Sequence, residues 1–268
     1  MAIVPAGAPR RRVLIANARR GNNAALPFAG CCTIAFAARI QALPEGAMID
    51  FTRLRRSMVD SQIRPNDVTD PRIIEAMLEL PRERFVPRAR ANLAYLDDDL
   101  SVSEGSGVTR CLIEPMVLAR LVQTLQLSET DRALDIGGAT GYSTALLARL
   151  ARHVVMVEED PTLISAARRN LSELGIDNVE FATGPLKAGA PGKGPFDAIL
   201  LNGSVEVVPE DLLAQLEEGG RLAAVVQGSP PGRATLYVRA GGVVSQRPVF
   251  DAAVTPLPGF EAPRGFVF

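Results

Sequence analysis

The sequence predicts an α/β fold, a doubly wound and mostly parallel sheet that follows a helical N-terminal leader and ends in an antiparallel hairpin. From Arg132 onward, short apolar segments alternate with amphipathic ones, which is the pattern of repeated βα units. Connections between parallel strands are right-handed, so helices must cover both faces of the sheet. Two strand-like segments then flank Gly241 and Gly242, which favours a hairpin over a further crossover.

Helical signals dominate the leader, residues 50–100. Asp70 is a candidate N-cap, Pro71 fits the first helical position, and apolar residues recur on one helical face after them. A Gly/Ser/Thr-rich segment at 101–109 precedes another helix, which begins at Pro115. We expect the loop before this helix to lie over a ligand site.

Strands and helices alternate through the predicted core. Asp160 caps the best-marked helix, with Pro161 at its first position and Gly175 at its end. The expected strands lie at 133–136, 154–157, 179–183, 198–201 and 222–226, and those of the hairpin at 235–239 and 243–246. The other expected helices lie at 143–150 and about 209–216, the second closed by Gly219 and Gly220.

Residues 1–47 differ in composition from the rest of the chain. They hold arginines among alanines and no acidic residue before Glu45, which is compatible with a basic tail, an export signal or a translation start at Met48. We favour the start at Met48 and expect 1–47 to be a disordered extension or a mis-assigned start. The predicted organisation is therefore 1–47, a helical leader with its loop over 48–130, and the core over 131–268.

Composition and charge exclude several classes of protein. Lys and Arg number 29 against 30 Asp and Glu, so no overall field draws the chain to nucleic acid or to a membrane. Three cysteines and one histidine, His153, make neither a disulfide framework nor a metal cluster. No apolar run reaches the roughly 20 residues of a membrane-spanning helix. We expect a cytoplasmic protein without a metal, and leave its oligomeric state open.

The clearest motif is a glycine-rich turn after the first core strand, Asp135-Ile136-Gly137-Gly138-Ala139-Thr140-Gly141. Glycines permit a sharp turn there and let backbone N–H groups approach a ligand. Alone, the motif is equally compatible with an ordinary strand-to-helix turn. Asp135, however, precedes the glycines, where a carboxylate suits the positively charged amino-acid end of S-adenosylmethionine.

A second acidic residue supports a cofactor site. Glu158 ends the next strand, roughly 20 residues after the glycines, where a carboxylate can accept both ribose hydroxyls. The alternative is a solvated carboxylate beside Glu159 and Asp160. The terminal hairpin also favours the methyltransferase version of this architecture over the dinucleotide-binding one. The residues expected to bind S-adenosylmethionine are Asp135, Gly137, Gly138, Ala139, Gly141 and Glu158.

Ordered segments between about Met48 and Phe260 resemble the protein-L-isoaspartate O-methyltransferase family. They are Pro81-Arg82-Glu83-Arg84-Phe85-Val86-Pro87, Ala94-Tyr95-Leu96-Asp97, Leu134-Asp135-Ile136-Gly137, Val157-Glu158, Asn170-Leu171, Asn178-Val179, Pro195-Phe196-Asp197-Ala198-Ile199 and Gly219-Gly220-Arg221-Leu222. The resemblance implies a Rossmann-like methyltransferase fold that binds S-adenosylmethionine. It also implies methyl transfer to the side-chain carboxylate of an isomerised aspartate in a protein or peptide, which begins protein repair.

The chain departs from the family in two places. Family members carry a Gly-x-Gly-Gln-Thr-Ile-Ser-x-Pro loop whose serine is associated with the acceptor. Counting back from Pro115 puts Ile113 at the serine position, and counting forward from Val102 puts Ser106 at the glutamine position, so the loop is longer and altered. Gly184-Pro185 replaces the acidic turn near the adenine, and proline offers neither a carboxylate nor an N–H. We therefore expect weakened cofactor binding and an altered acceptor site.

Methyl transfer to a carboxylate needs little acid–base chemistry, because the acceptor is already ionised at neutral pH. Placement and exclusion of water do most of the work. The lack of a spare histidine base counts only against acceptors that must lose a proton. The candidate catalytic residues are Arg110, which attracts an anionic acceptor unless it is a surface arginine, and Glu114, which contacts substrate unless it only favours the helix start.

Two other functions compete with carboxyl methylation. One is a cofactor-binding or regulatory protein of the same fold that has lost isoaspartyl activity, and the other is a small-molecule methyltransferase. Binding of S-adenosylmethionine without transfer to an isoaspartyl peptide would favour either of them. An absence of binding would favour a scaffold without cofactor.

Overall fold

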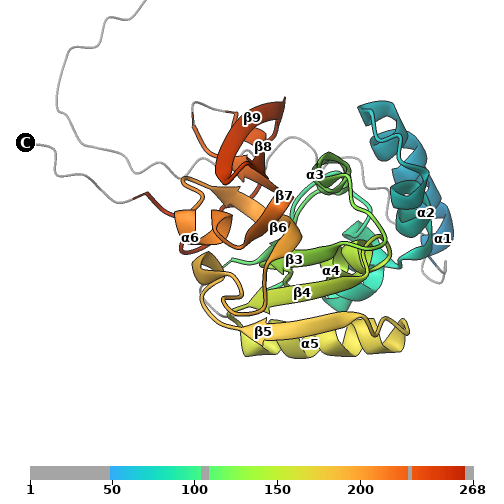
Figure 1. The fold of residues 1–268 in the computed structure, drawn as a ribbon. Helices are drawn as coiled ribbons and strands as arrows, with labels where there is room; N and C mark the ends of the chain where they lie inside the picture. Colours follow the sequence, from blue (N-terminus) through green and yellow to red (C-terminus); the bar gives the residue numbers. More distant parts are fainter. Residues whose placement is uncertain (1–48, 104–108, 229–230, 263–268) are drawn as a thin grey trace, which may run out of the picture. The chain divides into compact units, whose positions relative to one another are not determined.

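A central sheet of seven strands organises the chain in the computed structural model, which describes residues 49–103, 109–228 and 231–262 (Figure 1). Met48–Phe268 form one compact unit. The expectations for residues 1–47 and for Ser106 lie outside the described residues. The strands are β3 (Arg132–Ile136), β4 (His153–Glu158), β5 (Val179–Thr183), β6 (Phe196–Val205), β7 (Leu216–Val226), β8 (Arg233–Ala240) and β9 (Val243–Asp251).

The sheet has the order β5-β4-β3-β6-β7-β8-β9. The first five strands in this order pair in parallel, and β8 and β9 join them antiparallel. The predicted fold class, a mostly parallel sheet with a terminal antiparallel hairpin, is confirmed. The chain runs from β3 outward to β5 on one side and continues from β6 on the other, so the order reverses between β3 and β6. Ligands of open α/β sheets bind at such a reversal.

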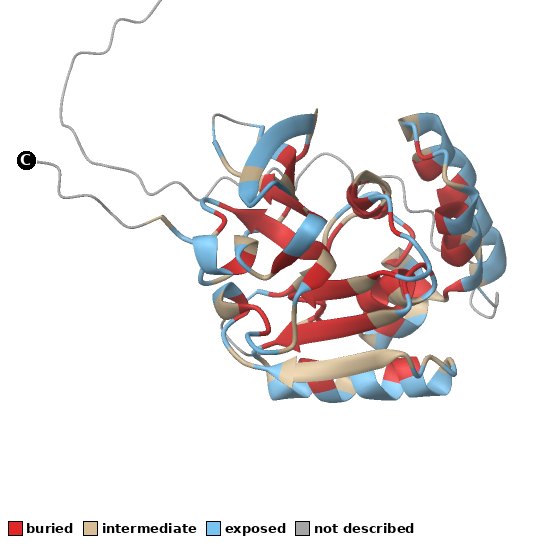
Figure 2. Cartoon of the chain, in the orientation of Figure 1, coloured by how far each residue is buried: buried red, intermediate tan, exposed pale blue. Residues whose placement is uncertain are grey.

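Helices and loops bury both faces of this sheet in two hydrophobic clusters (Figure 2). The first cluster joins the leader to α3 (Pro115–Leu125), α4 (Tyr142–Ala148) and α5 (Pro161–Glu173). The second joins the other face to α6 (Glu210–Leu213) and to the segment 257–260. β3 and β4 are buried almost throughout, as expected of strands covered on both sides.

The leader forms helices where capping signals predicted them. α1 (Phe51–Met58) continues into a π-helical turn, Val59–Ile63, and α2 (Pro71–Glu79) begins after Asp70, whose carboxylate accepts the Arg72 N–H at 2.9 Å. Two 3-10 helices follow, Arg82–Phe85 and Arg88–Leu93. The leader shares its core with α3 and α4, so it is an integral part of the same folded unit.

Two glycines expected to close a helix lie in a strand instead. The helix predicted at about 209–216 is only α6, and β7 begins at Leu216, before Gly219 and Gly220. Register jumps from Phe196↔Leu216 to Ala198↔Arg221, so β7 carries a bulge there. A Cβ on Gly220 would lie 2.8 Å from the Glu217 carbonyl oxygen, which explains why the bulge requires glycine.

The loop region after the leader contains a short hairpin that the sequence did not predict. β1 (Leu100–Ser101) pairs antiparallel with β2 (Cys111–Leu112). Val102 extends this pairing, since its N–H donates to the Arg110 carbonyl oxygen at 2.8 Å. The hairpin therefore sets the position of Arg110 relative to the core.

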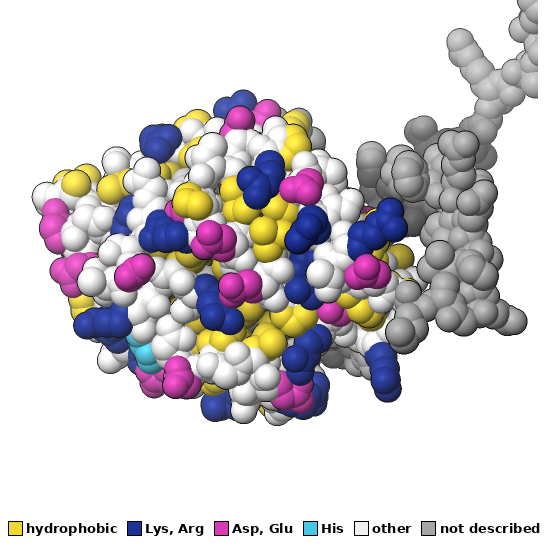
Figure 3. All heavy atoms as spheres, turned by 90° about the vertical axis from the view of Figure 1, so that its right-hand side faces the viewer, with side chains coloured by type: hydrophobic (Ala, Val, Ile, Leu, Met, Phe, Trp, Pro, Cys, Tyr) yellow, Lys and Arg dark blue, Asp and Glu magenta, His cyan; other side chains and the backbone are white. Residues whose placement is uncertain are grey.

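The outside of the molecule shows no single-sign field on the face in Figure 3, where cationic and anionic side chains are interspersed. Among the described helices, none combines the length and apolar character needed to cross a membrane.

Candidate active site

The glycine-rich turn connects β3 to α4 at the point where the strand order reverses. Three of its residues have positive φ: Gly137 (73°), Ala139 (51°) and Gly141 (98°). The Gly137 N–H donates to the Val157 carbonyl oxygen at 2.9 Å, which ties the turn to β4. A Cβ on Gly141 would lie 3.1 Å from the Ala167 Cβ, so this glycine lets α5 pack directly against the turn.

Asp135 is fully buried beneath the turn. Its carboxylate accepts hydrogen bonds from Ser143 Oγ at 2.9 Å, from Thr144 Oγ1 at 2.5 Å and from the Asn202 side-chain amide. Burial raises the pKa of Asp135 to about 6, against the lowering effect of these donors. The carboxylate is therefore ionised at neutral pH, and its oxygens are occupied by residues that hold the turn in place.

Asn202 was not predicted as a site residue. It lies where β6 departs from regular pairing, since the register shifts between Leu200 and Ser204. The irregular segment turns the Asn202 amide toward the end of β3, and it also donates to the Ile136 carbonyl oxygen at 3.3 Å. An asparagine in an apolar strand was the available signal, but its partner is 67 residues away in the sequence.

Glu158 ends β4 beside the turn and is 1% exposed. One carboxylate oxygen, Oε2, accepts from the Ala139 N–H at 3.0 Å, and the other, Oε1, from the Glu159 N–H at 2.9 Å. In register, Asp135 pairs with Met156, so Asp135 and Glu158 lie on the same side of the sheet. The alternative of a solvated Glu158 carboxylate is wrong.

Arg110, which directly precedes β2, reaches into the site and pairs with Glu158. Its Nη2 lies 2.7 Å from Glu158 Oε2, and its side chain is only 5% exposed, so the alternative of a surface arginine is also wrong. A Cβ placed on Gly137 would lie 2.6 Å from Arg110 Nη2 and 2.7 Å from Leu257 Cδ1. These two side chains therefore cover the glycine turn.

A small cavity remains beside the turn, with a volume of about 10 Å³. This is room for about one water molecule. It is lined by Arg82, Cys111, Leu112, Ile113, Leu118, Gly137, Gly138, Tyr142, Ser143 and Asn202. A ligand larger than water requires Arg110 and Leu257 to move away from Gly137.

Arg82 is a further site residue that we did not single out from the sequence. It is fully buried, lies 4.7 Å from the Tyr142 ring centroid, and donates to the carbonyl oxygens of Ala94 and Ile113, each at 2.8 Å. Within the described residues, Arg82 Nη1 and the Tyr142 hydroxyl have no hydrogen-bond partner. Two buried polar groups thus border the cavity with unused hydrogen-bonding capacity.

Ile113 and Glu114 stand at the end of the altered loop. Ile113 is 3% exposed and lines the cavity, whereas the half-buried Glu114 does not. Burial, reinforced by the negative charges of Asp97, Asp99 and Asp98, raises the pKa of Glu114 to about 7. Glu114 is the N-cap residue of α3, but its side chain makes no capping hydrogen bond.

Glu159 contacts the turn that contains Pro185. Its Oε1 accepts the Leu186 N–H at 2.8 Å, which brings a carboxylate from the end of β4 to the turn after β5. The carboxylate satisfies this backbone donor.

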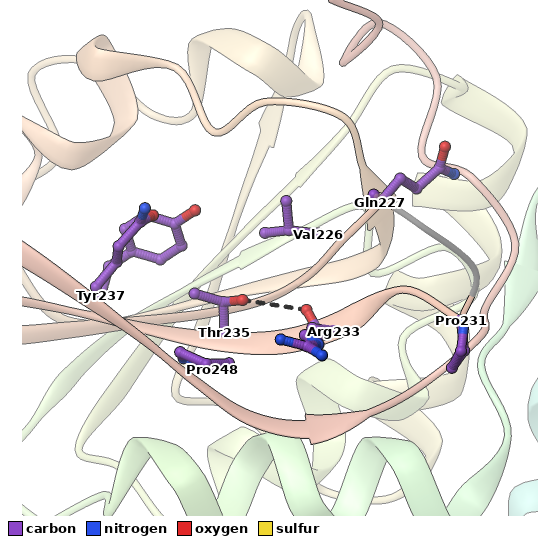
Figure 4. A pocket seen from close by; sticks show the side chains of 9 residues that line it. Val226, Gln227, Pro231, Arg233, Thr235, Tyr237 and Pro248 are labelled. Carbon is purple, nitrogen blue, oxygen red and sulfur yellow. Dashed lines mark hydrogen bonds between the residues drawn. The ribbon is translucent and has the colours of Figure 1, made fainter.

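Two grooves of about 400 and 510 Å³ lie outside the covered turn. One of about 400 Å³ borders Thr140 and is lined by Arg84, Val102 and Arg169 among others. The other, of about 510 Å³, lies against the terminal hairpin and includes Tyr237 (Figure 4). None of the expected cofactor residues lines this second groove. It is therefore not part of the candidate cofactor site.

Comparison with known proteins agrees with this geometry. A family model described as Protein-L-isoaspartate(D-aspartate) O-methyltransferase (PCMT) matches residues 53–261. The chain belongs to the protein-L-isoaspartate O-methyltransferase family. The family is one of S-adenosylmethionine-dependent enzymes, so the predicted family and enzyme class are confirmed.

Relatives in the protein-L-isoaspartate O-methyltransferase family match over nearly their whole length. Those of Methanoculleus marisnigri and Roseiflexus castenholzii are 35% and 36% identical, covering 77% and 80% of this chain and 92% and 96% of theirs. A solved protein-L-isoaspartate O-methyltransferase is 28% identical at a TM-score of 0.66, over 78% of this chain and 66% of its own. A Plasmodium falciparum structure, titled as a putative family member in complex with S-adenosyl-L-homocysteine, shares the fold at 21% identity and a TM-score of 0.62, covering 78% and 99%.

Proposed function

We propose that this protein uses S-adenosylmethionine to methylate a carboxylate of isoaspartyl residues in proteins or peptides. The observation that carries the proposal is the buried Glu158 carboxylate beside a positive-φ glycine turn, at the reversal point of the sheet. Family membership supports the same cofactor and acceptor.

The residues present fit this cofactor. Gly137 leaves no Cβ on the side of the turn that faces Arg110 and Leu257, and Glu158 offers a carboxylate for the ribose hydroxyls. Gly138 lets the turn pack against the Asp135 carboxylate and Thr144 Oγ1, each 2.7 Å from its Cβ position. The unpartnered Arg82 Nη1 and Tyr142 hydroxyl border the same turn and supply hydrogen-bond donors for a polar ligand. The cofactor-binding set remains Asp135, Gly137, Gly138, Ala139, Gly141 and Glu158, with Asp135 acting from beneath the turn.

Bound S-adenosylmethionine supplies a methyl group on an electrophilic sulfonium. The protein's part is placement and exclusion of water, because the acceptor carboxylate is already ionised. Asp135 holds the turn through Ser143 and Thr144, and the apolar Ile113 lines the cavity beside the turn. No side chain has to move a proton in this reaction.

Acceptor recognition is the altered part of the site. We propose that Arg110 binds the acceptor carboxylate, since its guanidinium lies against Gly137 and its Nε has no hydrogen-bond partner within the described residues. The groove of about 400 Å³ that borders Thr140 and Val102 supplies room for the peptide, with Arg84 and Arg169 as cations along it. Glu114 does not line the cavity, so we assign it no part in the chemical step. We propose that it adds to the negative charge that Asp97, Asp98 and Asp99 place beside the loop.

The proposed partners are isoaspartyl proteins or peptides, without nucleic acid or membrane. On the face in Figure 3 the cationic and anionic side chains are interspersed, whereas a phosphate backbone is bound by cationic stripes. We also propose a cytoplasmic location, in keeping with the few cysteines of the chain.

The deciding experiment is calorimetric titration with S-adenosylhomocysteine followed by methyl transfer from labelled S-adenosylmethionine to an isoaspartyl peptide. Micromolar binding and transfer to this peptide, with none to the same peptide containing normal aspartate, are expected. Binding without transfer refutes the acceptor, and no binding refutes the cofactor.

A further inference from the structure

The guanidinium of Arg110 stands in the place that the proposed function gives to the cofactor ribose. Within the part of the chain that the structure describes, Glu158 Oε2 has two partners, Arg110 Nη2 at 2.7 Å and the Ala139 N–H at 3.0 Å. Arg110 Nη2 also lies against Gly137, 2.6 Å from where a Cβ would stand on that residue. A ribose hydroxyl and this guanidinium therefore compete for the same carboxylate oxygen.

We propose that Arg110 is exchanged between two carboxylates: it holds Glu158 when the crevice is closed, and it binds the acceptor carboxylate once the cofactor has taken Glu158. This inference rests on the proposed function. It makes the Arg110–Glu158 pair an internal competitor of the cofactor and imposes an order in which cofactor binds before acceptor.

Burial makes the exchange consequential. Both side chains are nearly inaccessible, 5% and 1% exposed, so breaking the pair leaves each charge without water to solvate it. Arg110 also has an unused donor, since its Nε lacks a hydrogen-bond partner within the described residues. A guanidinium with one oxygen as its side-chain partner is incompletely satisfied, and a second carboxylate can bind it by two donors.

The place of Arg110 in the fold permits such a movement. It lies just before the two-residue strand β2, and its N–H is held by Ser103 Oγ at 3.0 Å. The separate two-stranded sheet of β1 and β2 has few backbone bonds to hold it, whereas Glu158 belongs to β4, a strand paired on both sides. Arg110 is therefore the partner that moves, and the groove at Val102 borders its segment.

The test is calorimetric titration of S-adenosylhomocysteine into the wild-type protein and Arg110→Gln. Removing the competitor should tighten binding by about tenfold, within the usual range of coupling between ligands. Arg110→Gln should also lower the melting temperature of the free protein, and saturating S-adenosylhomocysteine should raise it by more than in the wild type.

Arg221→Gln is the matched control. Arg221 forms a partly buried pair with Asp131, at 2.9 Å, at the N-terminal end of β3, whereas the glycine turn follows the C-terminal end of that strand. This variant should lose stability while keeping the wild-type affinity for S-adenosylhomocysteine. If Arg110→Gln does not fold, Arg110→Lys provides a second test. Lysine keeps the positive charge but cannot bind a carboxylate through two parallel N–H groups, so a smaller gain in affinity for S-adenosylhomocysteine is expected.

Acceptor binding tests the second half of the exchange. An isoaspartyl peptide should bind the wild-type protein only when S-adenosylhomocysteine is present, and Arg110→Gln should weaken that binding by about tenfold or more. The exchange is overturned if Arg110→Gln binds S-adenosylhomocysteine no more tightly than the wild-type protein does. It is also overturned if the peptide binds the wild-type protein equally well with and without S-adenosylhomocysteine. If neither the wild-type protein nor the variant binds S-adenosylhomocysteine, the proposed function itself fails.

Discussion

Gly141→Ala tests how the glycine turn is held against α5. The residue has φ +98°, and a Cβ there would lie 3.1 Å from the Ala167 Cβ and 3.3 Å from the Ala167 Cα. A left-handed backbone costs alanine roughly 1–2 kcal/mol, and overpacking against a rigid helix adds roughly 1–3 kcal/mol. The free energy of unfolding should therefore fall by about 2–5 kcal/mol.

Gly175→Ala is the control that separates the two costs. Gly175 also has positive φ, +66°, at the end of α5, but no atom lies within 4 Å of its Cβ position. Only the backbone cost of roughly 1–2 kcal/mol should appear. Urea unfolding at neutral pH measures both variants, with unchanged slopes expected because the surface exposed on unfolding is the same.

The comparison also has a functional arm. Moving the turn away from α5 shifts Ala139, whose N–H binds Glu158, so Gly141→Ala should weaken S-adenosylhomocysteine binding while Gly175→Ala should not. Equal losses of stability in the two variants would show that the turn does not pack on α5 as described. Unchanged affinity in Gly141→Ala would separate the turn from the cofactor site.

Three further substitutions probe the buried charges and the altered loop. The pKa of Asp135 is raised to about 6 by burial, so the folded protein holds this proton more tightly and the free energy of unfolding falls as the pH rises through this range. Asp135→Asn should flatten that fall in urea titrations between about pH 4 and 6, and an unchanged profile would contradict the assignment. The pKa of Glu114 is raised to about 7, so its charge destabilises the folded protein at pH 8 but is absent near pH 4. Glu114→Gln should therefore stabilise the protein by up to about 1 kcal/mol at pH 8, a value reduced because the side chain is half-exposed, and should have no effect near pH 4. Equal effects at both pH values would contradict this prediction. Ile113→Ser should not fully restore isoaspartyl methylation. A hydroxyl must come within about 3 Å of the acceptor, and the backbone at residue 113 cannot shift to bring it there because Arg82 holds the Ile113 carbonyl oxygen. A methyl-transfer rate at the level of an active family member would refute this prediction.

Local chemistry was enough to predict most of the elements. Asp70 and Asp160 cap their helices as expected, with side chains that accept the N–H groups of Arg72 and Thr162. The hairpin around Gly241 and the glycine turn after β3 also lie where short-range signals put them. These features depend on residues a few positions apart, so the sequence carries their cause directly.

Failures occurred where the same local signal has two structural solutions. Gly219 and Gly220 are compatible with a helix end and with a β-bulge, and only pairing with β6 selected the bulge. The altered loop concealed the β1–β2 hairpin for a similar reason, because two-residue strands have too few residues to show periodicity.

The sequence by itself determined the family, the α/β fold and the acidic residues at the ends of β3 and β4. Tertiary structure alone decided what those acids contact. Arg110 and Glu158 are 48 residues apart, and Asn202 and Asp135 are 67 apart. Their meeting depends on strand order, on the register between β3 and β4 and on irregular pairing of β6. Composition and spacing do not encode that geometry, because contacts between distant residues are set by packing of the whole sheet.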